Sequence, residues 1–221
     1  MIVGETGCGK STQLPQYLYE AGWAASGEMI AIVQPRRVAA ITVATRVADE
    51  MGSVLGHRCG YTIRFEDCCS AATRVRFMTD GLLVREMMDD PLLTRYTVIM
   101  LDEAHERTLN SDICIGLLRK IAKIRKDLRL IIASATLDAV KFRDFFAPPN
   151  GDDDVTAAIL SVEGRQYPVE ILYSLDPVPD YVKATVETAI KIHLQEREGD
   201  ILAFLTGNNA LVQITFKFIQ M

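Results

Sequence analysis

The hydrophobic positions in the first part of the chain follow two alternating patterns. Continuous apolar runs at Ile30–Val33, Thr97–Leu101 and Leu130–Ala133 are typical of strands buried on both faces of a sheet. Between these runs, apolar residues recur at helical spacing. One predicted helical face consists of Leu14, Tyr17, Leu18 and Ala21, and a second consists of Val38, Ile41, Thr45 and Ala48. The pattern predicts an α/β fold, with a parallel sheet covered by helices on both faces.

A change in organisation is predicted near Gly164. Pro148–Gly151 and the aspartates after it predict a solvated loop, and Ala157–Val162 predicts a last strand of the first unit. The next predicted elements are strands at Val169–Tyr173 and Ile201–Leu205, and between them a helix marked by Val182, Val186, Ala189, Ile190 and His193. We therefore expect a first domain over residues 1–164. An incomplete second domain over 165–221 would end in a tail, Val212–Phe218, with the periodicity of a strand.

The composition limits the classes of protein that fit. No apolar run approaches the ~20 residues that span a bilayer, so we expect an intracellular protein with no membrane partner. The five cysteines are odd in number and include no C-x-x-C pair, which argues against a disulfide framework or a zinc site. The net charge of −5 means that any contact with nucleic acid must come from local groups.

A phosphate-binding loop is predicted at the start of the chain. Residues 4–11 read G-E-T-G-C-G-K-S and match G-x-x-x-x-G-K-[ST] at every fixed position. Glycines let backbone amides turn toward the phosphates, and the helix that follows adds the positive end of its dipole. We expect Lys10 to reach the β- and γ-phosphates and the Ser11 hydroxyl to ligate Mg²⁺. A chance glycine-rich turn is the alternative.

An acidic motif follows the strand predicted at Thr97–Leu101. Asp102 and Glu103 lie where a carboxylate at a strand's carboxyl end can serve a metal on the bound phosphates, so both are candidate metal ligands. Asp102 is expected to hold Mg²⁺ through its water, and Glu103 to orient and deprotonate the attacking water. A solvated acidic turn is the alternative. His105 has no second histidine four residues away, which excludes an H-E-x-x-H zinc site.

Seven motifs resemble, in the family's order, those of the DEAH-box branch of superfamily 2 RNA helicases. They are residues 4–12, Gln34–Ala40, Gly60–Asp67, Thr79–Leu83, Asp102–His105, Ser134–Thr136 and Phe204–Gly207. The resemblance covers nearly the whole chain. It implies a RecA-like P-loop NTPase lobe followed by the start of a second lobe, in a truncated form. It also implies an ATP-dependent RNA helicase that uses ATP, or another NTP, with Mg²⁺.

The resemblance implies roles for individual residues. The triphosphate would be bound by Gly4, Glu5, Thr6, Gly7, Cys8, Gly9, Lys10, Ser11 and Thr12, and Arg46 would stack on the nucleotide base. The catalytic residues would be Glu103, Asp102, Lys10 and His105. Hydrolysis would be coupled to domain movement by His105, Ser134 and Thr136. The RNA backbone would be contacted by Arg36, Arg37 and Thr79.

Taken without the resemblance, five of these side chains are better explained by structural or solvent-exposed positions than by ligand binding. Arg36 and Arg37 fit a solvated helix start, Ser134 and Thr136 fit caps at a strand end, and Arg46 fits an exposed helical position.

The chain departs from the family pattern at three places, the first of which is the strand before the phosphate loop, expected to have only about three residues from Met1 against a typical ~5–6. Cys8 takes a position often held by a small hydroxyl residue, and beyond Gly207 the strand-periodic tail replaces an acidic helix. The family's arginine fingers and RNA-clamping modules fall outside the chain. An arginine finger contributes ~10³–10⁵ in rate. We therefore expect binding of NTP and Mg²⁺, and poor RNA unwinding by this chain alone.

Members of the family act in RNA processing, so the resemblance further implies a nuclear protein with a role in mRNA splicing. Single-stranded RNA and a ribonucleoprotein or adaptor protein are the expected partners. Two other functions remain open. A transporter-type P-loop ATPase is opposed by the lack of an L-S-G-G-Q segment. A catalytically incomplete variant that binds only nucleotide or partners is favoured by the absence of the fingers.

Overall fold

The computed structural model describes residues 1–135, 139–148, 156–164 and 167–207. The chain divides into two compact units, Met1–Tyr167 and Pro168–Met221, close to the boundary that the sequence predicts at Gly164. We describe each unit by itself.

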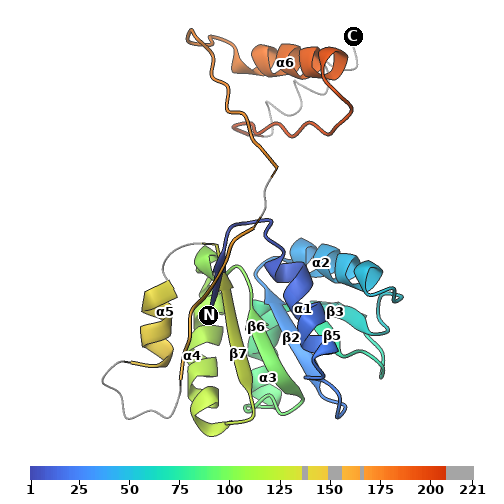
Figure 1. Ribbon diagram of the computed structural model, residues 1–221, viewed down its shortest axis with the longest axis vertical. Helices are drawn as coiled ribbons and strands as arrows, with labels where there is room; N and C mark the ends of the chain where they lie inside the picture. The colour runs from blue at the N-terminus through green and yellow to red at the C-terminus, as the bar shows by residue number, and fades with distance from the viewer. Residues whose placement is uncertain (136–138, 149–155, 165–166, 208–221) are drawn as a thin grey trace. The chain divides into compact units, whose positions relative to one another are not determined.

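The first unit alternates strands with helices (Figure 1). In chain order its elements are β1 (Ile2–Gly4), α1 (Lys10–Glu20), β2 (Met29–Gln34), α2 (Arg37–Glu50), β3 (Cys59–Ile63), β4 (Glu66–Cys68), β5 (Val75–Thr79), α3 (Asp80–Asp89), β6 (Tyr96–Leu101), the 3₁₀ helix η1 (Ala104–Glu106), α4 (Leu109–Ile124), β7 (Arg129–Ser134), α5 (Ala139–Phe146) and β8 (Leu160–Val162). The predicted strands correspond to β2, β6, β7 and β8, whereas β3, β4 and β5 were not predicted.

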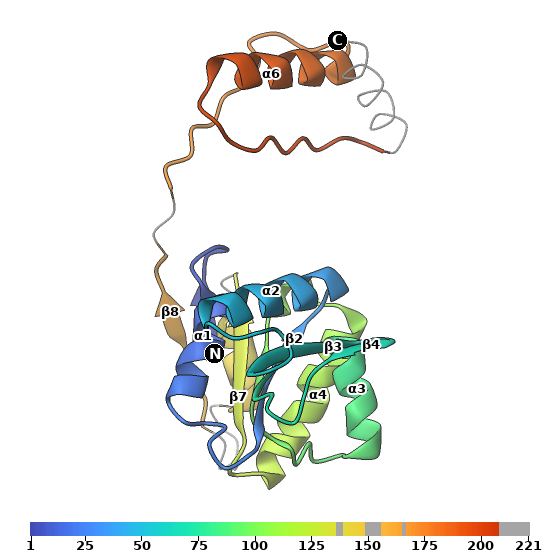
Figure 2. The same ribbon diagram turned by 90° about the vertical axis from the view of Figure 1, so that its right-hand side faces the viewer.

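The strands of the described first unit form one eight-stranded sheet with the order β4-β3-β5-β2-β6-β7-β1-β8. Neighbouring strands are parallel except in the β3–β4 hairpin, which is antiparallel and lies at one edge of the sheet (Figure 2). The central strand β2 pairs with β5 at Ile32↔Phe77 and with β6 at Ile32↔Met100. This is the parallel α/β architecture that the sequence predicts, and it is consistent with a RecA-like lobe.

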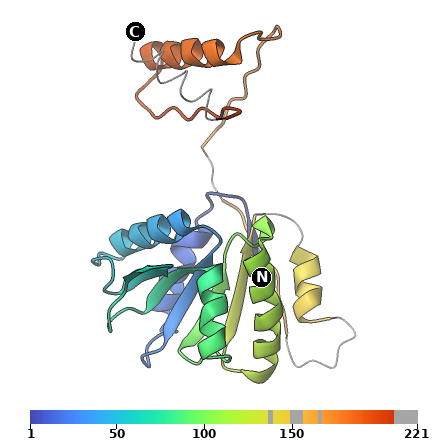
Figure 3. The same cartoon turned by 180° about the vertical axis from the view of Figure 1, so that it is seen from behind.

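Helices cover both faces of the sheet, with α1 and α2 on one face and α3, α4 and α5 on the other (Figures 1 and 3). On β2, Ile30 and Ile32 belong to the core under α1 and α2, whereas Ala31 and Val33 belong to the core under α3 and α4. All four side chains are at most 2% exposed. Burial of a side chain such as Ile32 contributes about 1.5–3 kcal/mol, so the strand is held from both sides.

The helical faces predicted from the sequence are only partly the buried ones. Tyr17 in α1 is 59% exposed and Val38 in α2 is 71% exposed, although both were expected to face the core. The residues of α2 that are buried are mostly small: Ala40, Ala44, Val47 and Ala48. Alanine lets a helix lie close to the sheet, and a search for large apolar residues overlooks it.

The second unit contains one helix in its described residues, α6 (Tyr181–Gln195), where the sequence predicts it. The strands predicted at Val169–Tyr173 and Ile201–Leu205 are wrong, because both segments lack strand pairing and most of their apolar side chains are exposed. An extended segment becomes a strand only beside a hydrogen-bonding neighbour, and residues 167–207 supply none. Most of the loop predicted at Pro148–Asp154 and the tail Val212–Phe218 lie outside the described residues. Across the described helices, none has the length and apolar character needed to cross a bilayer.

A buried polar cluster joins α3 to β3, β5 and β6. The Arg76 guanidinium donates to Glu86 Oε1 at 2.7 Å, to the Tyr96 hydroxyl oxygen at 2.7 Å and to Thr62 Oγ1 at 2.8 Å. The Tyr96 hydroxyl donates in turn to Glu86 Oε2 at 2.7 Å. The Arg76 side chain is 9% exposed, so its charge depends on the Glu86 carboxylate for compensation.

We predict that Glu86→Ala destabilises the first unit by about 3 kcal/mol, because it leaves the buried Arg76 charge without its partner. Asp112→Ala removes the partner of the exposed Arg107 and should cost less than about 1 kcal/mol. Urea unfolding followed by the fluorescence of Trp23, the single tryptophan, measures both. Equal effects would show that the Arg76 cluster has no special importance.

Candidate nucleotide-binding site

The predicted catalytic motifs follow strands that end at the same edge of the sheet. Gly4 ends β1 and leads into the phosphate loop, Gln34 ends β2, Asp102 follows β6, and Ser134 ends β7. These strands are parallel, so the four positions lie at the carboxyl edge, where α/β sheets bind their ligands.

The phosphate loop has the backbone form expected of an anion-binding turn. Gly7 and Gly9 have φ angles of 87° and 90°, a region that glycine enters without steric cost. Helix α1 begins directly after Gly9, at Lys10. The first N–H groups of α1 therefore adjoin the turn, and they and the helix dipole favour a negatively charged ligand there.

The Lys10 side chain is folded into the loop. Its Nζ donates to the Gly4 carbonyl oxygen at 2.6 Å and to the Glu5 carbonyl oxygen at 2.8 Å, and it lies 3.5 Å from Cys8 Sγ. Lys10 is only 6% exposed. A buried ammonium held only by carbonyl oxygens gains an oppositely charged partner when an anion enters, because the attraction between two unit charges is strong where water is excluded.

Asp102 and Gln34 form a second part of the site. Gln34 Nε2 donates to Asp102 Oδ2 at 2.7 Å, and the Glu103 N–H donates to Asp102 Oδ1 at 2.9 Å. Both side chains are nearly fully buried. The carboxylate is therefore oriented before any ligand binds. The sequence analysis assigned no role to Gln34. Its place directly after a predicted strand, like that of Asp102, could have indicated that the two side chains meet at one edge of the sheet.

Glu103 has an unusual backbone and an altered acidity. Its φ of 51° and ψ of 36° lie in the left-handed region, which side-chain-bearing residues rarely occupy. Burial raises the pKa of the Glu103 carboxyl, and the Asp102 charge raises it further, while His105 and Lys10 oppose the shift. A carboxylate with a raised pKa accepts protons more readily, as a general base should.

Oxygen donors suited to Mg²⁺ are present at this edge. The described residues contain no group of three or more His, Cys, Asp or Glu side chains that could hold a metal alone. Mg²⁺ commonly uses one or two protein oxygens and takes the others from water and phosphate. Ser11, in the first turn of α1, and the oriented Asp102 fit that requirement. Ser11 and Asp102 were predicted as metal ligands with Glu103.

The predicted coupling residues lie beside Glu103. His105 Nδ1 is 3.4 Å from Glu103 Oε2 and accepts a hydrogen bond from the Ala135 N–H at 3.4 Å. His105 thus contacts both the acidic motif and the segment after β7. Ser134 is buried at the end of β7. Thr136 lies outside the described residues.

The predicted RNA contacts follow β2 and β5, whereas the phosphate loop follows β1. Arg36 pairs with Glu106 at 3.2 Å, and Arg37 donates to the Arg64 carbonyl oxygen at 3.4 Å. Thr79 precedes α3 as its N-terminal cap residue.

Arg46, the residue predicted to stack on the nucleotide base, lies on α2 and is paired with Glu50 at 2.5 Å.

The β3–β4 hairpin adds a residue that the sequence analysis missed. Phe65, in the turn, is 90% exposed and has a φ of 69°. The Arg64 guanidinium lies 4.8 Å from the centre of the Phe65 ring. Because Arg37 contacts this turn, an exposed aromatic ring lies close to the predicted RNA contacts.

Gly164, just beyond β8, is another residue to which the sequence analysis assigned no role. A Cβ atom at Gly164 would lie 2.4 Å from Cys8 Cβ and 2.9 Å from Cys8 Cα. The chain that leaves β8 therefore touches the phosphate loop so closely that only glycine fits. Contact between residues so far apart in the sequence gives no local signal.

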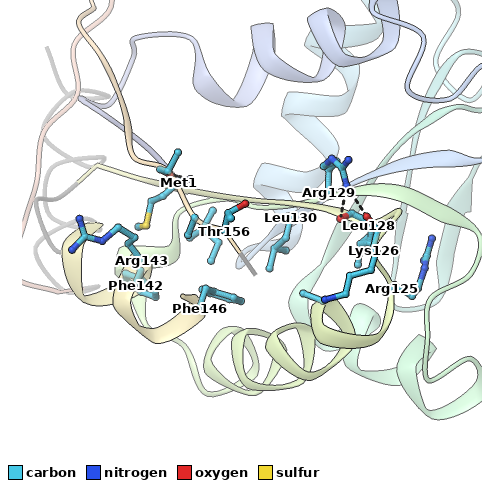
Figure 4. A pocket seen from close by; sticks show the side chains of 14 residues that line it. Met1, Arg125, Lys126, Leu128, Arg129, Leu130, Phe142, Arg143, Phe146 and Thr156 are labelled. Carbon is cyan, nitrogen blue, oxygen red and sulfur yellow. Dashed lines mark hydrogen bonds between the residues drawn. The ribbon is translucent and has the colours of Figure 1, made fainter. Parts of the chain in front are cut away.

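A cavity of about 470 Å³ lies along β7, between this strand, the end of α4, α5 and residues 156–158 (Figure 4). Its lining includes Met1, Leu130, Phe142, Arg143 and Phe146. Met1 precedes β1, whereas the phosphate loop follows β1. The cavity is therefore separate from the site formed by Lys10 and Asp102.

Comparison with known proteins found close relatives. The probable ATP-dependent RNA helicase DHX35 of Homo sapiens is 64% identical to the whole chain, over a segment that makes up 32% of its own length. Its counterpart in Pongo abelii is also 64% identical to the whole chain, over 31% of its own length. A Caenorhabditis elegans homolog of DHX35 is 58% identical over 98% of the chain and 30% of its own length. The chain thus spans about a third of the length of these curated relatives. No protein-family profile matches it.

We predict that Gly164→Ala weakens ATP binding at least about tenfold, because the added methyl group must displace Cys8 or the segment after β8. Gly116→Ala, where an added Cβ meets nothing within 4 Å, is the matched control and should leave binding unchanged. Titration with a fluorescent ATP analogue measures both variants. Unchanged binding by Gly164→Ala would show that the loop accommodates the contact.

Proposed function

The whole chain is homologous to a segment of DEAH-box RNA helicases, and from this premise we propose that it binds and hydrolyses ATP or another NTP with Mg²⁺. The intact protein would use this hydrolysis to remodel RNA or ribonucleoprotein. The observation that carries the proposal is the Lys10 ammonium inside a phosphate loop at the same sheet edge as the oriented Asp102.

The proposed binding step is an exchange of partners at Lys10. Its Nζ leaves the carbonyl oxygens of Gly4 and Glu5 and binds phosphate oxygens, while the turn at Gly7 and Gly9 offers backbone N–H groups. Ser11 and Asp102 would hold Mg²⁺, which would supply positive charge to the phosphate oxygens.

Glu103 is the proposed base for the attacking water. Its raised pKa favours proton acceptance, and the Glu103 N–H bond to Asp102 ties its position to the metal ligand. His105 reaches both Glu103 and the segment after Ser134. We assign His105, Ser134 and Thr136 to the coupling of hydrolysis with domain movement, and Arg46 to stacking on the base.

The proposed RNA surface combines Arg36, Arg37 and Thr79 with the exposed ring of Phe65. The charged and hydroxyl groups position the phosphate backbone and read no sequence. An aromatic side chain adds a stacking surface for a base. This combination lets a chain with a net charge of −5 bind RNA through local groups.

At the cellular level we propose a nuclear protein that acts in RNA processing, including mRNA splicing, with single-stranded RNA and an adaptor or ribonucleoprotein as partners. The support is the resemblance to the DEAH-box family and the names of the relatives as RNA helicases. A second function, nucleotide binding without turnover, is favoured for the isolated chain because the segment covers only about a third of its relatives.

We predict that Mg²⁺-ATP raises the melting temperature of the chain, because a ligand that binds only the folded state stabilises it. Lys10→Ala should abolish the shift by removing the phosphate contact. Glu103→Gln is the matched variant and should keep the shift, since it preserves Asp102 and Ser11. In the full-length protein, Glu103→Gln should lose at least about 10²-fold in turnover.

Differential scanning fluorimetry and a phosphate-release assay give the two readouts. Equal shifts in wild type and Lys10→Ala would contradict the phosphate loop assignment. Wild-type turnover by Glu103→Gln would contradict its role as base. Binding without turnover by the isolated wild-type chain would favour the second function.

We also predict that Phe65→Ala lowers the affinity for single-stranded RNA about tenfold, since one base–aromatic stack contributes ~1–3 kcal/mol. Met88→Ala removes another exposed apolar side chain, near the end of α3, and should have no effect. Fluorescence anisotropy with a labelled oligonucleotide at fixed salt compares them. Equal affinities would exclude the hairpin from the RNA surface.

A further inference from the structure

Glu50, at the end of α2, uses both oxygens of its carboxylate. Oε1 accepts from Arg46 Nε at 2.5 Å, and Oε2 accepts from Gln13 Nε2 at 2.8 Å and from Gln16 Nε2 at 2.7 Å. Three donors from α1 and α2 thus meet on one carboxylate. These hydrogen bonds, led by the one from Gln16, lower the pKa of Glu50, so the group is ionised at neutral pH.

The arrangement differs from an ordinary ion pair on a helix surface. The Glu50 side chain is 23% exposed, whereas both partners of the pair Lys183–Glu187 on α6 are more than 60% exposed and 3.7 Å apart. Both are i,i+4 pairs, which usually contribute only ~0.3–0.5 kcal/mol. Only Glu50 has additional donors from a second helix. Its position is therefore fixed by α1 as well as by its own helix.

The same carboxylate is connected to the phosphate loop. Gln16 Nε2 also donates to the Thr12 carbonyl oxygen at 3.0 Å, and the Gln13 N–H donates to the Gly9 carbonyl oxygen at 2.8 Å. Gln13 and Gln16 belong to the helix that carries Lys10. A short chain of contacts thus runs from the phosphate loop through these two glutamines to Glu50 and then to Arg46.

We propose that Glu50 is a positioning residue that holds the Arg46 guanidinium at a fixed place relative to the phosphate loop, so that it stacks on the base of the bound nucleotide. The inference rests on the proposed function, because it assumes that Arg46 meets the base. Arg46 is itself 68% exposed and has long, flexible side-chain torsions. The fixed carboxylate reduces the conformational entropy that Arg46 loses when a base binds.

This role predicts an effect on the base component of affinity alone. Stacking on a guanidinium depends on the π-face that every base has, so ATP and GTP should be affected alike. Inorganic triphosphate has no base and contacts only the phosphate loop. Its affinity should not depend on Glu50.

The test compares Mg²⁺-ATP, Mg²⁺-GTP and Mg²⁺-triphosphate binding to the full chain by isothermal titration calorimetry. Glu50→Gln keeps the size of the side chain but removes its charge and one acceptor. We expect it to weaken ATP and GTP about fivefold and to leave triphosphate unchanged. Arg46→Lys, which keeps a charge but lacks the planar π-face, should lose the same component.

Asp49→Asn is the matched control. It makes the same charge change at the neighbouring exposed position and should bind all three ligands like the wild type. Melting temperatures without ligand identify any variant that is merely unfolded, and Glu50→Asp then replaces Glu50→Gln. Wild-type ATP affinity in Glu50→Gln, or an equal loss for triphosphate, would overturn the proposal. If the wild type binds triphosphate and ATP equally, the base-stacking premise fails instead, and if it binds neither, the proposed function itself is wrong.

Discussion

The parallel pairing of β2 with β6 is the constraint on which the rest of the site depends. Val33 lies opposite Leu101, and the Asp102 N–H continues the ladder by donating to the Val33 carbonyl oxygen at 2.9 Å. That register brings Gln34 to Asp102. A slip of one residue would turn the apolar side chains of β2 to the wrong faces. The two hydrophobic cores therefore fix the register, and with it the position of the Asp102 carboxylate beside Gln34.

The parts of the structure that the sequence predicts have strong local signals. The phosphate loop follows from fixed glycine and lysine spacing, and β2, β6 and β7 follow from uninterrupted apolar runs. The strands β3 and β5 lack such runs because they contain Thr62 and Arg76. The buried Arg76 guanidinium is satisfied by Glu86, Tyr96 and Thr62, and the Thr62 hydroxyl donates in turn to Asp67. Polar residues in a core depend on partners distant in sequence, which local periodicity does not reveal.

The residues that the sequence analysis missed share this origin. Gly164 is required by Cys8, and Glu50 is shared by Gln13, Gln16 and Arg46. The opposite error occurs at Val169–Tyr173 and Ile201–Leu205, where local periodicity is strong but the described residues offer no strand beside them. The resemblance supplied roles for single side chains, whereas the geometry shows which of them contact one another.

The left-handed backbone of Glu103 lowers the stability of the fold, whereas its side chain is needed for the proposed function. A side-chain-bearing residue in this conformation costs about 1–2 kcal/mol, and glycine does not carry that cost. Glycine would also remove a carboxyl group held partly buried beside Asp102. Selection for heat resistance alone would therefore tend to erase the proposed base, and an engineered, more robust variant has to gain its stability elsewhere in the sheet.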